Sequence, residues 1–314
     1  MFNLIILHNT IPKKILKKKI LNQYNNYIIV SFYKYFFIKD VGITRDILYL
    51  FFSTINVLGR VYISSEGINA QVSVPNKNYF IMKNFIRNLH DNLKNLNFNE
   101  ALENKPNAFF LLIVKVKKKI VQDNLQHNFF DSTKLKNYLN AIQVNCMIND
   151  PDTIFVDVRN DYEFQIGHFN NALHISSNTF SETMKNIVSQ LKRFQEKNIV
   201  LYCTGGIRCE KAASWLLFNK FKKIYQVKNG IIGYVHDARK KNIEVHFKGA
   251  NFVFDARMIE HVSYDTLGQC RHCKKKCDNY INCKNSICNN LFIQCMNCNI
   301  QYKNYCSKKC VSSF

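Results

Sequence analysis

A cysteine lies in a short glycine-rich loop, between a run of residues typical of a strand and a run typical of a helix. The loop reads Cys203-Thr204-Gly205-Gly206-Ile207-Arg208. Two glycines let the backbone turn sharply, and the free N–H groups and dipole at the start of the next helix favour an anion. A thiolate is such an anion, and its pKa in this setting falls from about 8.5 to about 3.5–7.5. We therefore predict a reactive thiolate at Cys203, in preference to a buried cysteine that packs as a small apolar side chain.

A second group of chemically active residues is a Cys-rich tail. Cys270-x2-Cys273 and Cys295-x2-Cys298 are separated by 21 residues, which is close to the spacing of zinc knuckles. The tail also contains Cys277, Cys283, Cys288, Cys306 and Cys310. Nine cysteines fill two four-thiolate sites with one left over, and the spacing does not reveal which four belong together. We expect structural zinc to supply folding energy to a segment this small and polar. An iron–sulfur cluster, or reduced cysteines without metal, are the alternatives.

The charge of the chain indicates a polyanionic partner. Its 44 basic and 22 acidic residues leave a net charge of +22. Part of this excess fits the codon drift of an AT-rich genome, because Asn, Ile, Phe and Tyr are plentiful too. The basic side chains nevertheless gather in three runs: Lys13, Lys14, Lys17, Lys18 and Lys19; Lys115, Lys117, Lys118 and Lys119; and Lys274, Lys275 and Lys276. Nucleic acid is the partner that these runs favour.

The first third of the chain has the pattern of an α+β domain. Apolar spacing predicts strands over 28–38, 59–64, 68–74 and 108–121 and helices over 44–56 and 78–96. The order strand, helix, strand, strand, helix, strand is that of a ferredoxin-like sandwich with an antiparallel sheet.

The middle of the chain alternates differently. We expect strands over 153–158, 198–202 and 223–227 and helices over 134–147, 181–195, 209–221 and 231–240, with Ser181 as an N-cap. This alternation predicts a doubly wound parallel sheet, and sites in such sheets lie beyond the carboxyl ends of the strands. Cys203 follows one such strand directly. From about Gly249 the pattern breaks.

The cellular setting follows from what the sequence lacks. No apolar run approaches the roughly 18 residues of a membrane span. The N-terminal apolar run is short and no basic region precedes it, so we expect no signal peptide and a cytoplasmic location. The twelve cysteines are then expected to be thiols or metal ligands and not disulfides.

Around the predicted site the sequence resembles rhodanese domains. The resemblance rests on the stretch 155–164, on Gly167-His168-Phe169 and on Ala172. It implies that Asp157 and Arg159 support the active-site loop; an ordinary structural ion pair is the alternative. The loop has six residues, as in sulfur-handling rhodaneses, whereas phosphatases of similar shape have a longer loop that makes room for phosphate.

Motifs in the rest of the chain resemble a more specific family. Residues 203–212, 65–70 and 251–257, with the Cys-rich end, resemble bacterial rhodanese-type tRNA uridine hydroxylases over about residues 27–310. This family implies oxygen-dependent formation of 5-hydroxyuridine at the tRNA wobble position, with molecular oxygen as co-substrate and tRNA as partner. A Gly-x-Gly-x-x-Gly motif is absent, so no nucleotide cofactor is expected.

The fold expected is α/β with four parts. These are a basic lead-in over residues 1–26, a ferredoxin-like (acylphosphatase-like) α+β domain over 27–125, a rhodanese-like doubly wound parallel sheet over 130–245, and a linker with the small Cys-rich segment over 246–314.

The chemistry of the loop is left open by the sequence. The Cys203 thiolate either attacks carbon 6 of the uracil or carries a persulfide or sulfenic acid. Cys209 is either a second, resolving thiol or a packed helix residue. Arg208 either holds a phosphate or the uracil carbonyl or is a surface residue beside the loop. Two other functions compete: a sulfurtransferase that carries a Cys203 persulfide, and a binding module with an inert loop.

Overall fold

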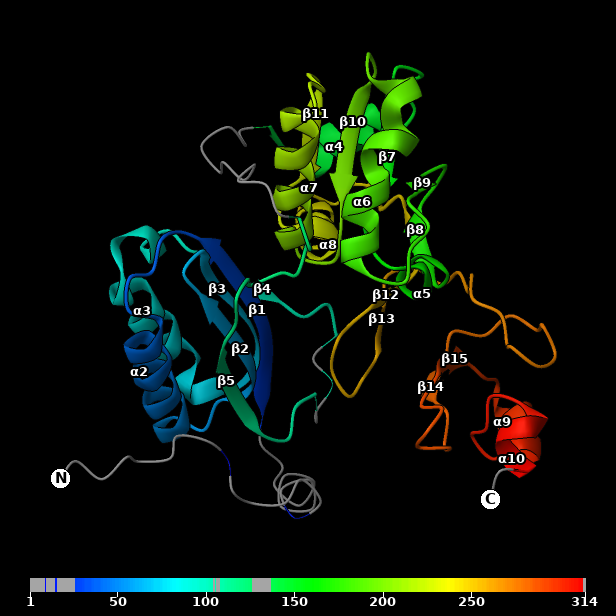
Figure 1. Ribbon diagram of the computed structural model, residues 1–314, viewed down its shortest axis with the longest axis horizontal. Helices are drawn as coiled ribbons and strands as arrows, with labels where there is room; N and C mark the ends of the chain where they lie inside the picture. Colours follow the sequence, from blue (N-terminus) through cyan, green and yellow to red (C-terminus); the bar gives the residue numbers. More distant parts are fainter. Residues whose placement is uncertain are drawn as a thin grey trace. The chain divides into compact units, whose positions relative to one another are not determined.

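The computed structural model describes residues 9, 15, 26–103, 105, 108–125 and 137–312 (Figure 1). The basic run Lys13–Lys19 and the start of the helix expected over 134–147 lie outside these residues. The chain forms two compact units. Unit 1 comprises Met1–Gln122 with Asp255–Arg257, and unit 2 comprises Asp123–Phe254 with Met258–Phe314. Within the described residues, no helix is both long enough and apolar enough to span a bilayer.

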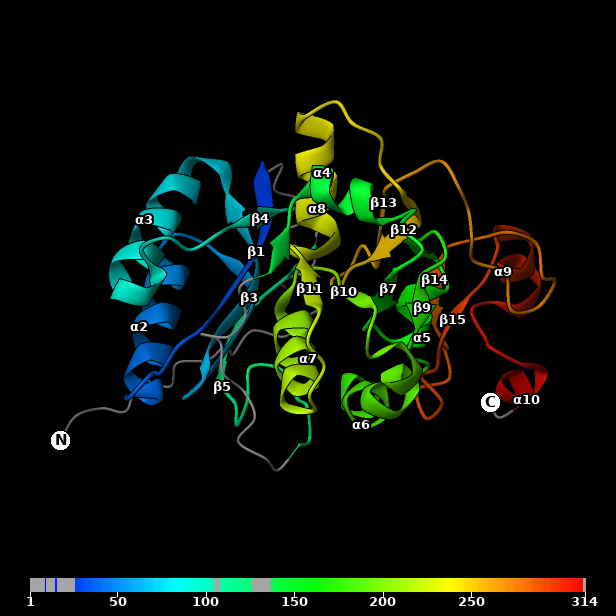
Figure 2. The same cartoon turned by 90° about the horizontal axis from the view of Figure 1, so that it is seen from above.

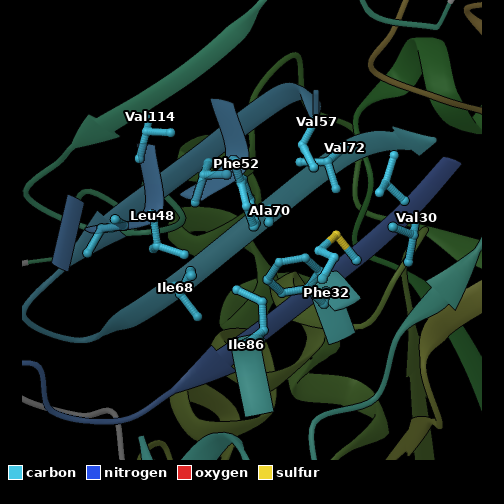
Figure 3. Packing of buried hydrophobic residues seen from close by; sticks show 14 of the residues in the cluster. Val30, Phe32, Leu48, Phe52, Val57, Ile68, Ala70, Val72, Ile86 and Val114 are labelled. Carbon is cyan, nitrogen blue, oxygen red and sulfur yellow. The ribbon is translucent and has the colours of Figure 1, made fainter. Parts of the chain in front are cut away.

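Unit 1 is a five-stranded sheet with two helices on one face (Figure 1). The strand order is β4-β1-β3-β2-β5. The strands are β1 (Tyr27–Tyr35), β2 (Leu58–Ser64), β3 (Gly67–Pro75), β4 (Asn99–Glu100) and β5 (Leu112–Val116). The helices are α2 (Val41–Thr54) and α3 (Tyr79–Leu89), with short 3-10 turns at Asn76–Asn78 and Asp91–Leu93. Alternate strand residues such as Phe32, Ala70 and Val114 pack with Leu48 and Ile86 of the helices to form the core (Figure 3).

The ferredoxin-like strand order is present, but the sheet is not purely antiparallel. The short strand β4, and not the long apolar run over 108–121, takes the fourth position beside β1. The apolar run contributes β5, which pairs parallel to β2 at the other edge. Its first residues do not pair, because Ala108 and Phe109 pack against Ile29 on the face that the helices leave open. The helix expected over 78–96 is also shorter, since α3 ends at Leu89.

Unit 2 is built on a parallel five-stranded sheet in the order β6-β11-β10-β7-β9. The strands are β6 (Tyr138–Leu139), β7 (Thr153–Asp157), β9 (Leu173–His174), β10 (Asn198–Tyr202) and β11 (Ile224–Val227). Helices α4 (Ala141–Met147) and α8 (Gly230–Lys240) lie on one face and α6 (Phe180–Leu191) and α7 (Ile207–Phe218) on the other (Figure 2). This is the doubly wound arrangement that the alternation predicts, with a 3-10 turn at Lys192–Phe194 after α6.

Two helix starts differ from the prediction. Ser181 is not the N-cap of α6; the side chain of Thr179 accepts the N–H of Glu182 instead. The first helix begins only at Ala141, because Asn140 and Gln143 form a capping box. Tyr138–Leu139 before it is extended and pairs with β11. The polar cap of α6 thus lies two residues earlier than predicted, and before Ala141 a capping box overrides the apolar periodicity.

The segment where the pattern breaks contains strands that the sequence did not predict. β12 (Phe247–Phe252) pairs antiparallel with β8 (Gly167–Phe169) and with β13 (Ile259–His261). A Cβ added to Gly167 would lie 2.2 Å from the carbonyl oxygen of Ala250, so glycine is needed for the strands to approach. The Cys-rich tail follows as a hairpin of β14 (Tyr280–Asn282) and β15 (Leu291–Ile293), with helices α9 (Met296–Tyr302) and α10 (Lys308–Ser312).

Candidate active site

Cys203 lies at the carboxyl end of β10, where the chain turns into α7, and is buried. Gly206 has a φ of 99° and directs its N–H to the Cys203 sulfur at 3.1 Å. The start of α8 closes the other side of the loop: Ile231 donates to the Cys203 carbonyl at 2.9 Å and Ile232 to the Thr204 carbonyl at 3.2 Å. The loop is thus held between the first turns of two helices, and its backbone N–H groups converge on sulfur.

The surroundings of Cys203 favour its thiolate. Burial opposes ionisation, yet the pKa of Cys203 falls to about 6. The pKa is lowered by a hydrogen bond from the Cys209 thiol, by the positive charge of Arg208, and by the backbone N–H groups of Cys209 and Arg208. Cys203 is therefore largely ionised at neutral pH without a neighbouring general base.

Cys209 lies in the first turns of α7 and is also buried. Burial raises the pKa of its thiol, and so does its hydrogen bond to the Cys203 sulfur. Within this pair Cys209 keeps its proton and Cys203 loses it. The geometry brings the two thiols together as a donor and an acceptor.

Arg208 does not lie on the surface; its exposed fraction is 8%. Its two terminal nitrogens donate to the two oxygens of Glu163 at 2.5 and 2.8 Å, and one of them also reaches the Thr204 hydroxyl at 3.3 Å. The guanidinium carbon lies 5.8 Å from the ring centre of Phe254. Arg208 is thus engaged by the protein and helps to hold the loop from one side.

Glu163 is the residue of this site to which sequence reasoning assigned no role. It lies on the short helix α5 (Asp161–Phe164) and is fully buried. Besides Arg208, it accepts hydrogen bonds from the Thr204 hydroxyl at 3.3 Å and from the backbone N–H of Asn160 at 3.1 Å. The available signal was the capping-box spacing from Asn160 to Glu163, which predicts the helix start but not the partner 45 residues away.

Asp157 and Arg159 form a buried ion pair where β7 ends, beside the end of β10. Both side chains are 0% exposed, and the guanidinium meets the carboxylate at 2.6–3.1 Å. Arg159 also donates to the Gly167 carbonyl of β8 at 2.5 Å, and its guanidinium lies over the rings of Tyr202 and Phe247. The pair joins β7 to β8 below the loop that carries Cys203.

The tail cysteines form two groups whose sulfur atoms lie within 4.8 Å of one another. The first is Cys270, Cys273, Cys295 and Cys298; the second is Cys283, Cys288, Cys306 and Cys310. The groups alternate along the chain in pairs, which the spacing did not reveal. Cys277 is the cysteine left over. Each group has the ligand number of a four-thiolate metal site.

Comparison with known proteins covers nearly the whole chain. Residues 27–120 match the UPF0176 acylphosphatase-like domain, 140–237 the rhodanese-like domain and 248–311 the rhodanase C-terminal model. The tRNA uridine(34) hydroxylase of Buchnera aphidicola subsp. Acyrthosiphon pisum (strain APS) is 50% identical over 309 residues, which are 98% of this chain and 95% of that protein.

More distant relatives carry the same name. The tRNA uridine(34) hydroxylases of Escherichia fergusonii and of Escherichia coli (strain SE11) are each 44% identical over 305 residues, which are 97% of this chain and 87% of each relative. The matched residues cover 97% of the chain. The chain belongs to the tRNA uridine(34) hydroxylase family.

Proposed function

We propose that this protein hydroxylates carbon 5 of uridine 34 in tRNA, with molecular oxygen as oxidant and Cys203 as nucleophile. The observation that carries the proposal is the low-pKa thiol of Cys203 in a chain that is 50% identical to a tRNA uridine(34) hydroxylase. A hydroxylase needs an oxidant, and oxygen is the simplest one that supplies the new hydroxyl. The proposal assigns RNA binding to residues 27–125 and the chemistry to residues 130–245.

The thiolate makes carbon 5 reactive by adding to carbon 6 of the uracil. The new C–S bond moves the C5–C6 electron pair onto carbon 5 and oxygen 4. Carbon 5 then combines with oxygen, and the resulting peroxide anion takes up a proton from water to form a hydroperoxide. A thiol reductant supplies two electrons and two protons, which leaves a hydroxyl on carbon 5 and releases water and a disulfide. Loss of the proton on carbon 5 expels Cys203 as thiolate and restores the double bond. Covalent catalysis of this kind divides one difficult step into easier ones.

The neighbours of Cys203 position it. The Gly206 N–H and the Cys209 thiol point at its sulfur and support the ionised state. Because both Arg208 terminal nitrogens face Glu163, we assign Arg208 to holding the loop and supplying positive charge, and not to binding a phosphate. Asp157 and Arg159 keep the strand ends beneath the loop in place.

Part of the sheet face of unit 1 that lies opposite α2 and α3 suits tRNA, because Ala108 and Phe109 cover only the region around Ile29. Tyr33, Asn69, Tyr62 and Lys115 form one row across four paired strands. Their neighbours along the strands, such as Phe32 and Ala70, belong to the helix-facing core, so the row faces away from it. Lys117 lies over the Tyr62 ring at 5.6 Å, and both lysines are exposed. Aromatic rings on a sheet stack unpaired bases, and lysines beside them neutralise phosphates.

The two four-thiolate groups fit structural zinc. Sulfur pairs such as Cys273–Cys295 and Cys288–Cys306 lie 3.6 Å apart. A disulfide would need about 2.05 Å. Four thiolates at about 2.3 Å from a zinc ion lie about 3.8 Å apart. The backbone N–H groups of Cys295 and Cys306 also donate to the sulfurs of Cys270 and Cys283, which favours thiolates. Zinc would give this segment the cohesion that its small apolar core does not provide.

The decisive experiment is nucleoside mass spectrometry of tRNA from cells with the protein, without it, and with Cys203→Ser. We expect 5-hydroxyuridine and its derivatives to disappear in both defective strains. Loss of 2-thiouridine with unchanged hydroxylation would instead indicate a sulfurtransferase. Hydroxylation that survives Cys203→Ser would exclude the nucleophilic role.

A further inference from the structure

We infer that the hydroxyl of Tyr280 couples the Cys-rich tail to the Cys203 loop by fixing helix α5. Tyr280 is thus a positioning residue outside the rhodanese loop, and the tail becomes part of the active-site framework. The inference rests on the proposed function only in taking Cys203 as the reactive group. Each link of the coupling lies within unit 2.

The two four-thiolate groups lie next to the two strands of the β14–β15 hairpin. β14 runs directly into Cys283, a member of the second group, and β15 ends two residues before Cys295, a member of the first. Each strand of the hairpin would therefore be anchored by a different metal site.

Tyr280 makes the hydrogen bond that joins the hairpin to α5. The Tyr280 hydroxyl donates to the Tyr162 carbonyl at 2.6 Å, and Tyr280 is 5% exposed. Its ring packs edge-on against Phe252, which in turn packs edge-on against Tyr162. Ile293 of β15 joins Ile166, just beyond α5, in the same apolar cluster. The hydroxyl is thus directed at α5 by a fully packed aromatic ring.

Helix α5 needs such support and passes it to the loop. It has four residues, far fewer than the roughly 12–15 at which an isolated helix becomes even marginally stable. The carbonyl that accepts the Tyr280 hydroxyl belongs to the peptide unit between Tyr162 and Glu163. Glu163 then holds Arg208 and the Thr204 hydroxyl. Only two links therefore separate the tail from the groups around Cys203.

The test compares Tyr280→Phe, which removes only the hydroxyl, with Tyr305→Phe in the same tail. Tyr305 packs beside Cys283, Cys306 and Phe292 and so probes the metal segment itself. Three quantities are measured on each full-length variant: zinc per chain by native mass spectrometry, the pH midpoint of Cys203 alkylation by peptide-resolved mass spectrometry, and 5-hydroxyuridine formation.

We expect both variants to retain two zinc ions per chain. In Tyr280→Phe the alkylation midpoint rises by up to about one pH unit, the order of a single hydrogen bond, and hydroxylation at neutral pH falls by up to about tenfold. Tyr305→Phe keeps both wild-type values. An unchanged midpoint in Tyr280→Phe would overturn the coupling, and so would loss of zinc in that variant, because the hydroxyl would then act on the metal sites. If hydroxylation survives Cys203→Ser while Tyr280→Phe still shifts the midpoint, the proposed function fails and the coupling stands.

Discussion

Replacing Glu163 with glutamine tests the electrostatics of the site at one buried ion pair, Arg208–Glu163. Glutamine has the same shape, and its amide oxygen can still accept the N–H of Asn160 in the capping box. The substitution removes the negative charge opposite Arg208 and also the second oxygen, which accepts from Arg208 and Thr204. Both side chains are nearly or fully buried, so water cannot replace that charge.

The structure predicts that Glu163→Gln lowers both the folding stability of the protein and the pKa of Cys203. Removing one partner of a buried ion pair costs about 3–5 kcal/mol of folding free energy. For a domain of 150–250 residues this corresponds to a fall in Tm of about 6–20 °C. At the same time, the charge of Arg208 is no longer neutralised and acts more strongly on the Cys203 sulfur. The pKa of Cys203 should therefore fall below its value of about 6.

The assays are thermal unfolding followed by circular dichroism and the pH dependence of Cys203 alkylation. Glu182→Gln is the matched control, because Glu182 occupies the same third position of helix α6 and accepts the Asn178 N–H, but is exposed. It should cost less than about 1 kcal/mol and leave the alkylation midpoint unchanged. A Glu163→Gln protein as stable as this control would refute the buried pair. A rise of the midpoint would show that the loop depends on Glu163 for shape and not for charge.

Three further outcomes are expected. The alkylation midpoint of Cys203 lies near pH 6 in the wild type and rises in Cys209→Ala, because the thiol that donates to the sulfur is lost; an unchanged midpoint would show that Cys209 only packs. The pKa of Cys203 is lowered to about 6 in the folded state, so the stability that its ionisation contributes is complete above the pKa of an unfolded cysteine and is lost as pH falls through 6. Urea unfolding should accordingly show the advantage of the wild type over Cys203→Ser shrinking from pH 9 to pH 6, and a constant difference would contradict the ionised thiol. Lys115→Ala and Lys117→Ala should each weaken tRNA binding and lower the slope of log affinity against log salt by about one, as measured by filter binding; unchanged slopes would place the tRNA elsewhere.

Sequence patterns were most informative where structure is local. The strand over 198–202 has the predicted bounds, and the loop and helix after it follow as expected. Buried parallel strands are continuous apolar runs, and glycines mark the turn that follows, so both signals lie within a few residues. The family resemblance was confirmed for the same reason, because its motifs are contiguous.

Sequence patterns did not predict the strands whose extent depends on the strand they pair with. Residues 108–121 are apolar enough for a long strand, yet only Leu112–Val116 pair, and they do so parallel to β2. β4 has two residues and no periodicity, and it nevertheless occupies the ferredoxin-like position. Pairing at a sheet edge depends on which chain lies beside it, and no single segment carries that information.

The sequence alone therefore determined the chemistry that is available: a cysteine prepared by a glycine turn and a helix start, nine tail cysteines, and the family to which they belong. Only the tertiary structure decided the partners. Glu163 meets Arg208 across 45 residues, and Tyr280 meets Tyr162 across 118. The tail cysteines likewise separate into two alternating groups. Local conformation follows from short-range sterics and hydrogen bonding, whereas these pairings arise only when folding removes distant charges and thiols from water into the same place.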